Sequence, residues 1–564
     1  MASELPNTNA SSPPSGHMRQ RSRQACVPCR QRKRKCDGKL PCSTCTGYGY
    51  NCQYNNDEGQ RSTSKRSASD SSTQLPAAKV PRLASESNNH DPKQGTVPPL
   101  QHGILEPSKS RYMSRHSSVA FPRCLGLDLQ SANPPRLHSF AYHTGIRSEP
   151  GFAVSFQLIE FISWDKVRGL VDIYTSTIQP VFGFLDMDRL CQKCEEHWNG
   201  KPQGPGFEAI ISGVIGLASL FSGFLAEEQE TRIVLHAKEL LEDSYCSRFP
   251  SIEQVAAWIL RTIYIRATTR PHMAWLCSCI TMHLVEATGL HRETEGVVLA
   301  TDRKTGPAQE TSAIRERVAQ VARCLNVVIS YDYGRSIVDI GPMFQKQVEP
   351  RPGDFTHQLC GLVRAVPLDD MNQDTVTRRA DLIQGLDNLI ATPTDHDFLT
   401  LVRTELCFCI YRRLRLLDQC LRQEQLEKVI SVGTSALPAA RRLIAQNHPW
   451  WNVIGTVFQF VCVLLTIDTT ESLANIPEAM ETLEMITQNL NTHLANEAIN
   501  TARLLVCASV EKKRKGIAIL EGIGGVPALD NATGLENQWL LDETDWDAFL
   551  RPPATQFINM NFQL

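Results

Sequence analysis

Six cysteines near the start of the chain have the type and spacing of metal ligands. They follow the pattern C-x2-C-x6-C-x5-C-x2-C-x6-C and are Cys26, Cys29, Cys36, Cys42, Cys45 and Cys52. The pattern contains the half-motif C-x2-C-x6-C twice, and two thiolates three residues apart can grip one metal ion. Two separate four-thiolate sites would need eight cysteines, so six serve two ions only if two of them bridge. The sequence therefore predicts a compact two-zinc cluster, with a disulfide knot as the alternative.

The two half-motifs differ in charge, and only the first suits contact with DNA. Five of the six residues between its second and third cysteines are basic: Arg30, Gln31, Arg32, Lys33, Arg34 and Lys35. The matching segment of the second half, TGYGYN, carries no charge. Long cationic side chains neutralise phosphates and donate hydrogen bonds to base edges. Pro28 favours the first turn of a short helix and Gly38 favours its end, so the basic run is predicted to lie on a helix that enters a major groove. A solvated face or a nuclear-import signal is the alternative.

The spacing, the insert RQRKRK and the proline before the fourth cysteine resemble the zinc-cluster DNA-binding domain of fungal transcription regulators. The resemblance implies two Zn²⁺ ions per chain, with Cys26 and Cys42 bridging both. It implies that Cys29 and Cys36 complete one site, and that the other is completed by Cys45 and Cys52.

The resemblance also implies that the basic helix contacts a CGG-type triplet of double-stranded DNA. We expect base contacts from Arg32 and Lys33, the third and fourth residues after the second cysteine. Phosphate contacts are expected from three further residues, Arg30, Arg34 and Lys35.

Charge and composition divide the chain into parts. The 564 residues have a net charge of −2, but residues 1–82 hold 14 Lys+Arg and 5 Asp+Glu, a net of +9, so the remainder carries −11. A basic arm on an acidic body is typical of nucleic-acid-binding proteins. The predicted parts are a disordered N-terminus (1–18), the zinc-cluster domain (19–55), a disordered linker (56–118), an all-α regulatory domain (119–528) and a C-terminal tail (529–564).

The cellular compartment and the oligomeric state follow less directly. The N-terminus lacks the apolar core of a signal peptide, so the 19 cysteines are interpreted as reduced thiols of a nuclear protein. The linker is poor in large aliphatic residues and shows no sustained heptad register. A dimer made by a coiled coil directly after the cluster is therefore not expected. Monomeric binding and a homodimer through the large domain both stay open.

Long apolar-periodic segments predict that the large domain is all-α. The stretch AIISGVIGLASLFSGFLA (209–226) has no charge over 18 residues, but its Gly, Ser and Ala content favours a buried core helix over a membrane span. No membrane partner is therefore expected.

A second resemblance lies in RPHMAWLCSCITMHLVEATGLHRE (270–293). Its ending, GLHRE, is similar to the fungal-specific transcription factor domain that follows many zinc clusters. Six residues recur at helical spacing, namely Leu276, Cys279, Ile280, His283, Ala287 and Leu290. His283 is interpreted as a core histidine on the packed face of this helix. Gly289 is placed to end the helix.

Other residues with metal-ligand or catalytic chemistry carry weaker signals. Cys191, Cys194 and His197 have metal-ligand spacing, but no clear fourth ligand accompanies them, so a packed or exposed helix is preferred. None of the phosphate-binding, nucleophile-elbow or metalloprotease motifs occurs. The chain is therefore not expected to be an enzyme.

The C-terminal segment 535–550, LENQWLLDETDWDAFL, holds five acidic residues and no basic one. The acidic residues keep Trp539, Trp546 and Phe549 exposed to water, from where they can fold onto a coactivator groove. This pattern predicts a transcription activation segment. A C-terminal helix docked on the large domain is the alternative.

Together these features predict a nuclear, sequence-specific regulator of transcription. We expect an activator of a metabolic or biosynthetic gene set. The alternatives are a repressor, or a ligand-sensing regulator whose α-helical domain binds a small metabolite.

Overall fold

The computed structural model describes part of the chain. The described residues are 25–31, 36–48, 52–54, 104–106, 111–113, 117, 121–131, 157–242, 250–292, 298–299, 309–341, 343, 347–367, 373–417 and 421–524. By their contacts the residues form two units, Met1–Ala502 and Arg503–Leu564. The predicted N-terminus 1–18 and tail 529–564 lie outside the described residues.

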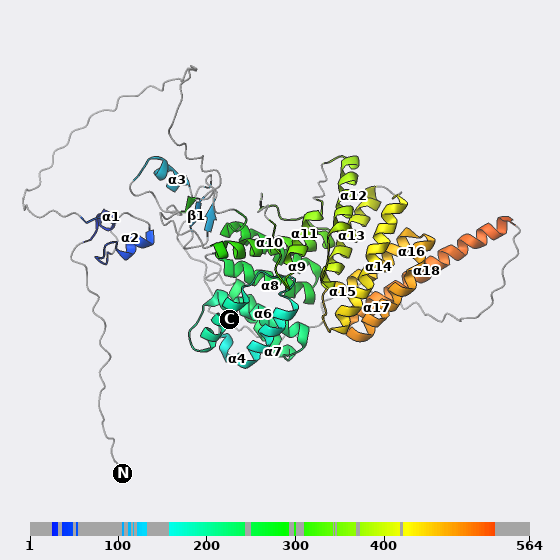
Figure 1. The fold of residues 1–564 in the computed structure, drawn as a ribbon, viewed down its shortest axis with the longest axis horizontal. Helices are drawn as coiled ribbons and strands as arrows, with labels where there is room; N and C mark the ends of the chain where they lie inside the picture. Colours follow the sequence, from blue (N-terminus) through cyan, green and yellow to red (C-terminus); the bar gives the residue numbers. More distant parts are fainter. Residues whose placement is uncertain are drawn as a thin grey trace, which may run out of the picture. The chain divides into compact units, whose positions relative to one another are not determined.

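Helices make up nearly all of the described structure (Figure 1). The short helices of the first 130 residues are α1 (Val27–Gln31), α2 (Ser43–Tyr48) and α3 (Phe121–Asp128). A 3-10 helix, Leu158–Glu160, precedes the large helical body. Its first helices are α4 (Trp164–Thr177), α5 (Met187–Trp198), α6 (Pro205–Ser222), α7 (Glu227–Glu242), α8 (Ile252–Thr268), α9 (Pro271–Thr288) and α10 (Gln309–Tyr333). The remaining helices are α11 (Thr356–Ala365), α12 (Thr375–Ala391), α13 (Asp397–Leu417), α14 (Gln423–Ala445), α15 (Asn452–Ile467), α16 (Thr470–Ala474), α17 (Ile476–Leu490) and α18 (His493–Gly524).

Local sequence signals set where several of these helices begin and end. The Asp186 side chain accepts a hydrogen bond from the Arg189 backbone N–H and so caps α5. Ser251 and Gln254 form a reciprocal capping box at the start of α8. Gly289 ends α9 in the left-handed region, with φ of 70°, as predicted from its position.

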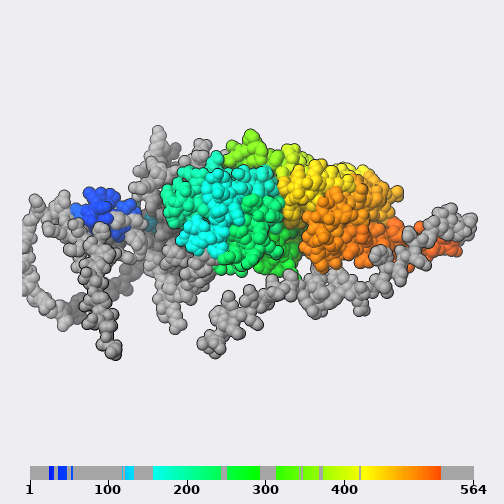
Figure 2. Space-filling view, turned by 90° about the horizontal axis from the view of Figure 1, so that it is seen from below, coloured from blue at the N-terminus to red at the C-terminus, as the bar shows by residue number. Residues whose placement is uncertain are grey.

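The helices pack as two adjoining groups within the first unit. Helix α4 contacts α5 and α6, and α6 to α10 pack in chain order, as do α12 to α17. Helix α10 contacts both α11 and α13. Figure 2 shows the cyan and green surface of the first group next to the yellow and orange surface of the second. The described residues therefore confirm a large all-α body.

Helix α6 lies at the centre of the first group. It is the one described helix that is long and apolar enough to cross a membrane. Two thirds of its residues, 67%, are buried inside the protein, and it packs against α4, α7 and α8. This burial agrees with the prediction of a core helix.

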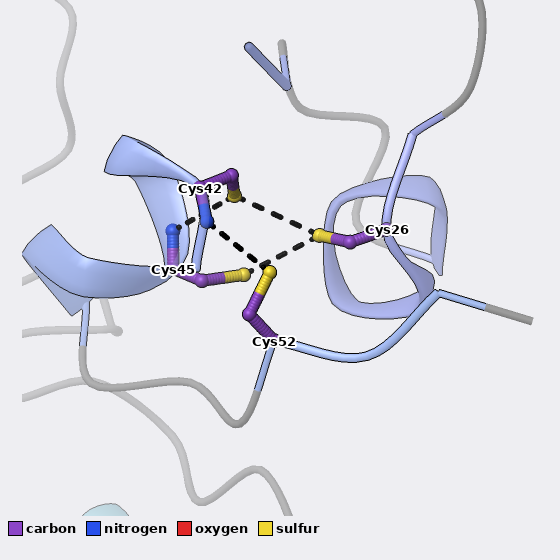
Figure 3. A group of neighbouring side chains, drawn as sticks. All are labelled: Cys26, Cys42, Cys45 and Cys52. Carbon is purple, nitrogen blue, oxygen red and sulfur yellow. Dashed lines mark hydrogen bonds between the residues drawn. The ribbon is translucent and has the colours of Figure 1, made fainter. Parts of the chain in front are cut away.

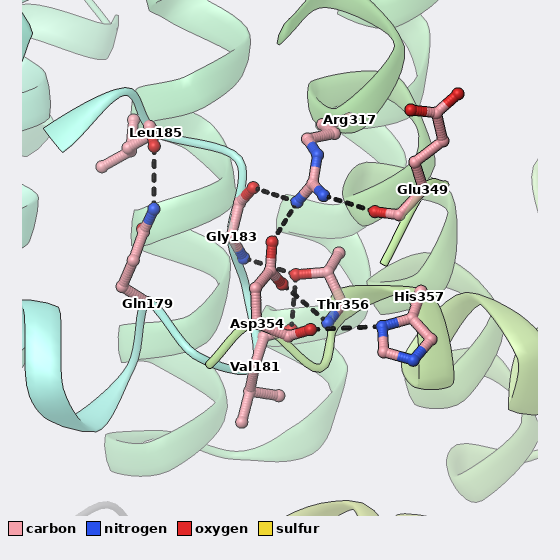
Figure 4. Close-up of polar contacts among 9 residues, drawn as sticks. All are labelled: Gln179, Val181, Gly183, Leu185, Arg317, Glu349, Asp354, Thr356 and His357. Atoms are coloured by element: carbon pink, nitrogen blue, oxygen red, sulfur yellow. Dashed lines mark hydrogen bonds and ion pairs between the residues drawn. The ribbon is translucent and has the colours of Figure 1, made fainter. Parts of the chain in front are cut away.

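A buried arginine ties segments that are far apart in the sequence (Figure 4). Arg317 of α10 pairs with Asp354 and donates to the carbonyls of Gly183 and Glu349 at 2.9 and 3.0 Å. The Thr356 hydroxyl accepts from the Gly183 N–H at 2.8 Å. These bonds satisfy backbone groups of two loops, which are otherwise costly to bury. They close the first helical group onto the loop that leads into α11.

The structure differs from the sequence prediction in the linker. Residues Ile104–Glu106 (β1) and Arg111–Met113 (β2) form an antiparallel pair, and β1 also pairs in parallel with Val298–Leu299 (β3). The resulting sheet has the order β2-β1-β3. Pairing across nearly 200 residues leaves no mark in local composition, so a polar linker sequence did not reveal it.

The prediction that His283 lies on the packed face of α9 was wrong, and of the six residues at that spacing Leu290 alone is buried. Leu276 and Ile280 are 44% and 42% exposed, and the His283 side chain is 65% exposed. The buried face instead carries Ala274, Cys277, Ser278, Thr281, Met282, Val285 and Thr288. This face is buried because α9 packs against both α8 and α10, and the contact buries the long Met282 side chain as well as small ones.

Helices α14 and α15 contact each other closely at Gly433, which predicts that a larger residue there is destabilising. A Cβ there would lie 2.1 Å from an atom of the Phe460 ring on α15, and Phe460 is fully buried. We expect Gly433→Ala to destabilise the body by about 3 kcal/mol through overpacking. The control is Gly455→Ala on α15, which has open space at its Cβ and should stabilise by ~0.5–1 kcal/mol. Urea midpoints of the helical signal measure both, and equal midpoints would contradict the contact.

Candidate zinc cluster and DNA-binding surface

Two short helices place the cysteines of the two half-motifs. Helix α1 follows Cys26 and α2 follows Cys42, and each cysteine carbonyl accepts the N–H four residues later, at 2.9 Å. Cysteines three residues apart then lie on the same side of one helical turn. Gly38 has φ of 79° but comes after two non-helical residues, so it turns the chain and does not end the helix as predicted.

The six sulfur atoms form two overlapping groups of four. Within each group all sulfur atoms lie within 4.8 Å of one another. One group is Cys26, Cys29, Cys36 and Cys42, and the other is Cys26, Cys42, Cys45 and Cys52. Figure 3 shows the second group, with the sulfurs directed toward one another. Cys26 and Cys42 belong to both groups, which is the sharing that two ions on six cysteines require.

The distances fit tetrahedral zinc. The Sγ–Sγ distances are 3.4 Å for Cys26–Cys45, 3.7 Å for Cys26–Cys42 and 3.6 Å for Cys29–Cys42. A Zn–S bond of about 2.3 Å in a tetrahedron places ligand sulfurs about 3.8 Å apart. The structure records these cysteines as free thiols and shows no disulfide among them, which removes the disulfide-knot alternative for the described residues.

Burial makes the thiols dependent on a cation. Loss of solvent raises the pKa of Cys26 to about 12 and also raises the pKa of Cys45. Metal ligation needs the thiolate, and a divalent ion supplies the charge that stabilises it in such a site. At Cys36 burial also acts to raise the pKa, but hydrogen bonds, first that from Tyr54, outweigh it and bring the pKa down to about 6.

Sequence reasoning missed the residues just after the last cysteine. The Tyr54 hydroxyl lies 3.3 Å from Cys36 Sγ and 3.1 Å from the Lys39 carbonyl oxygen. The Gln53 carbonyl accepts from the Val27 N–H at 2.8 Å. This segment therefore ties the end of the domain to α1 and to the turn between the half-motifs. An aromatic hydroxyl two residues beyond the motif was the one available signal, and its partners are far away in the sequence.

The basic residues are only partly covered by the structure. Arg30 lies on α1 and is exposed. The other four predicted DNA contacts, Arg32, Lys33, Arg34 and Lys35, lie outside the described residues. Trp539, Trp546 and Phe549 of the predicted activation segment also lie outside them.

The possible metal site of the large domain consists of Cys191, Cys194 and His197, and these residues are not among the described groups with metal-binding geometry. Cys194 and His197 are buried on α5, but His197 Nε2 faces Glu208 of α6 at 3.5 Å. The same carboxylate lies 2.8 Å from His236 Nε2 of α7. Burial lowers the pKa of His197, although Glu208 opposes this shift. Among the described residues Cys191 and Cys194 join no group of metal-binding geometry, which agrees with the preferred interpretation of a packed helix.

Comparison with known proteins agrees with this geometry. Residues 24–62 match the family described as "Fungal Zn(2)-Cys(6) binuclear cluster domain", and residues 171–349 match the "Fungal specific transcription factor domain". Protein RDR1 of Saccharomyces cerevisiae is 41% identical over 543 residues, which cover 96% of this chain and 97% of that protein. The chain belongs to the fungal zinc-cluster transcription regulators. The resemblance based on the cysteine motif and on GLHRE is thus confirmed.

Two further relatives of this zinc-cluster regulator carry informative names. Transcription factor kojR of Aspergillus oryzae is 34% identical over 89% of this chain and 86% of its own length. The Schizosaccharomyces pombe protein named "Probable transcriptional repressor C1348.12" is 24% identical over 76% of this chain and 93% of its own. The protein is therefore a DNA-binding regulator of transcription and not an enzyme, and its cluster domain holds two zinc ions.

The position of Tyr54 yields a prediction about zinc retention. Tyr54→Phe keeps the ring and removes the hydroxyl near Cys36 Sγ. Outer-sphere partners of metal ligands typically contribute 10–100-fold in metal affinity, so we expect zinc to be lost to a chelator about tenfold faster. The control is Thr46→Val, which removes a hydroxyl bonded to the Cys42 carbonyl and not to a sulfur. Equal release rates for both variants would show that Tyr54 does not support the cluster.

Proposed function

We propose that Cys26 and Cys42 bridge two zinc ions, each completed by two further cysteines of its half-motif. The proposal is supported by the two overlapping sulfur groups, which share these two residues. The ions hold α1 and α2 together and supply positive charge. Cys29 and Cys36 would then anchor the two ends of the basic run that lies between them.

The basic run between Cys29 and Cys36 is proposed to recognise a CGG-type triplet in double-stranded DNA. Arg32 and Lys33 would contact base edges in the major groove, and Arg30, Arg34 and Lys35 would contact phosphates. The support is the placement of basic residues in one half-motif alone, with Arg30 exposed at the end of α1. Action on DNA takes place in the nucleus, so we also propose nuclear localisation of this chain.

The division between base and phosphate contacts can be tested by alanine substitution. Lys33→Ala should weaken specific binding by roughly 1–3 kcal/mol and relax the preference at one triplet position. Arg34→Ala should weaken binding to all sequences alike and flatten its salt dependence, because a phosphate contact carries no sequence information. Fluorescence anisotropy with specific and random duplexes at several salt concentrations separates the two effects. Equal losses on both duplexes for both variants would overturn the assignment.

We propose that the regulator activates its target genes through residues 535–550. The support is the alternation of aromatic and acidic residues in that segment, with a coactivator as the partner. Relatives include a protein named as a repressor, so the sign of regulation is specific to each chain. Mapping genome-wide occupancy, together with transcript changes in a deletion strain, tests the sign and the proposed metabolic or biosynthetic gene set.

The aromatic residues should carry most of the activation. Changing Trp539, Trp546 and Phe549 to Ala in a fusion to an unrelated DNA-binding domain should reduce reporter output at least tenfold. Buried aromatic anchors dominate binding energy in such contacts, whereas one exposed charge contributes little. Neutralising Glu543 alone is the matched control and should leave most of the output. An inert wild-type fusion would exclude the activation role.

Two finer proposals depend on the large domain. A homodimer through this domain remains our proposal for paired sites, since the linker shows no heptad register.

The alternative function, sensing of a small metabolite by the helical domain, requires a cavity of suitable size. A cleft of about 220 Å³ lies between α6, α7 and α8, lined in part by Gln203, Glu253 and Gln254. Small-molecule sites usually occupy ≈ 300–1,000 Å³, and this cleft is smaller. Its volume therefore gives no reason to prefer the ligand-sensing hypothesis to regulation through DNA and coactivators.

A further inference from the structure

Helix α18 changes its environment along its length. One face of its first turns is buried in the large domain, with Ala495, Ile499 and Ala502 among the core residues. From Arg503 onward, residues are exposed or half-buried up to Gly522. This exposed part still carries large apolar side chains, namely Leu504, Leu505, Val510, Ile517, Ile519 and Leu520. The solvent-exposed surface of a helix is usually polar. Exposed apolar side chains in this number are typical of a docking surface.

The same part of α18 is strongly basic. Residues 503–524 contain five basic and two acidic residues, a net of +3, and four of the basic ones are consecutive: Lys512, Lys513, Arg514 and Lys515. Lys515 pairs with Glu511 at 2.6 Å, but both side chains are largely exposed and such a pair contributes little. The surface therefore combines exposed apolar side chains with positive charge and suits an acidic, apolar partner.

A second copy of this helix is a poor partner. The basic run 512–515 lies at the middle of residues 503–524. A two-fold antiparallel pair about that centre would place the four cations of one helix against the same four of the other. A parallel pair would do the same. Like charges opposite each other destabilise such helix pairs.

A better partner lies in the same chain. Residues 535–550 carry five acidic residues, no basic one, and the apolar side chains of two tryptophans, a phenylalanine and four leucines. The connector 525–534 has ten residues and spans up to ~33 Å, while residues 503–524 of the helix extend over ~32 Å. Gly525, Pro527 and Gly534 in the connector favour chain reversal. A tether this short gives an effective concentration of order mM.

We propose that residues 503–524 of α18 are a docking surface for the acidic segment 535–550 of the same chain. Docking places the acidic residues along the run 512–515 and buries Trp539, Trp546 and Phe549 against the apolar side chains of the helix. The aromatic anchors of the proposed activation segment are then covered, and a coactivator must displace α18 to bind them. This role in regulation rests on the proposed activation function, whereas the docking itself does not.

Hydrogen exchange of the full-length, zinc-loaded protein tests the docking directly. Deletion of residues 531–564 should speed amide exchange in 503–524 about tenfold. Changing Lys512, Lys513, Arg514 and Lys515 to Glu should have the same effect in the full chain. A charge-swapped variant combines this reversal with Asp542→Lys, Glu543→Lys, Asp545→Lys and Asp547→Lys, and it should restore protection of 503–524. The control replaces Lys512, Lys513 and Lys515 by Arg, which keeps the charge and should match the unchanged protein.

Three outcomes would count against docking within the chain. Exchange in 503–524 that is unaffected by the deletion would overturn the proposal. If the Glu reversal speeds exchange equally in the truncated chain, the reversal weakens the helix itself and the docking proposal fails. Protection that falls on dilution would instead assign the surface to a second copy.

Reporter assays add the regulatory readout. Changing the run 512–515 to Glu should raise transcription from a target promoter several-fold. The variant that also carries Lys in place of the four acidic tail residues should lower transcription again. If the isolated segment 530–564 fails to activate while the exchange pattern holds, the docking stands and the activation function falls. If the segment activates but the reversal changes neither exchange nor output, the activation function stands and the docking falls.

Discussion

The DNA-binding end of this protein depends on the bonding of six sulfur atoms to two metal ions. The described residues between 25 and 54 bury no apolar cluster other than the cysteines themselves, with Cys26, Cys42 and Cys45 fully enclosed. Structural zinc contributes about 10–16 kcal/mol in small domains of this kind, far more than such a short chain gains from apolar burial. The metal geometry thus sets the distance between α1 and α2, and it fixes Cys29 and Cys36 at the two ends of the basic run.

The large domain is held by different forces. Its core is built from apolar helix faces, and its long-range connections include the Arg317–Asp354 pair with the carbonyls it satisfies. Removing one member would leave a buried charge and unpaired backbone groups, which costs more than the pair gains. Zinc loss in the cluster domain and unfolding of the helical body are therefore expected to be separate events. A regulator built in this way can lose DNA binding while its regulatory body stays folded.

The α9 helix and Tyr54 show where reasoning from the sequence reached its limit. Periodicity identified α9 and Gly289 identified its end, but His283 was wrongly assigned to the packed face. In the structure Cys277, Thr281 and Met282 lie on the face that packs against α8 and α10, and Leu276 is left exposed. Tyr54 was missed because its partners, Cys36 and Lys39, are distant in sequence and are brought near it by the fold of the cluster.

The sequence by itself determined the chemistry of this protein. Thiol spacing and helical periodicity are local properties, so they identified the zinc cluster and the all-α body, and local basic charge predicts which half-motif contacts DNA. Tertiary structure alone decided which face of α9 is buried, how β1 pairs with β3, and where α18 becomes exposed. Each of these depends on contacts between residues separated by many positions, and the free energy of such contacts comes from packing and burial that no local pattern records.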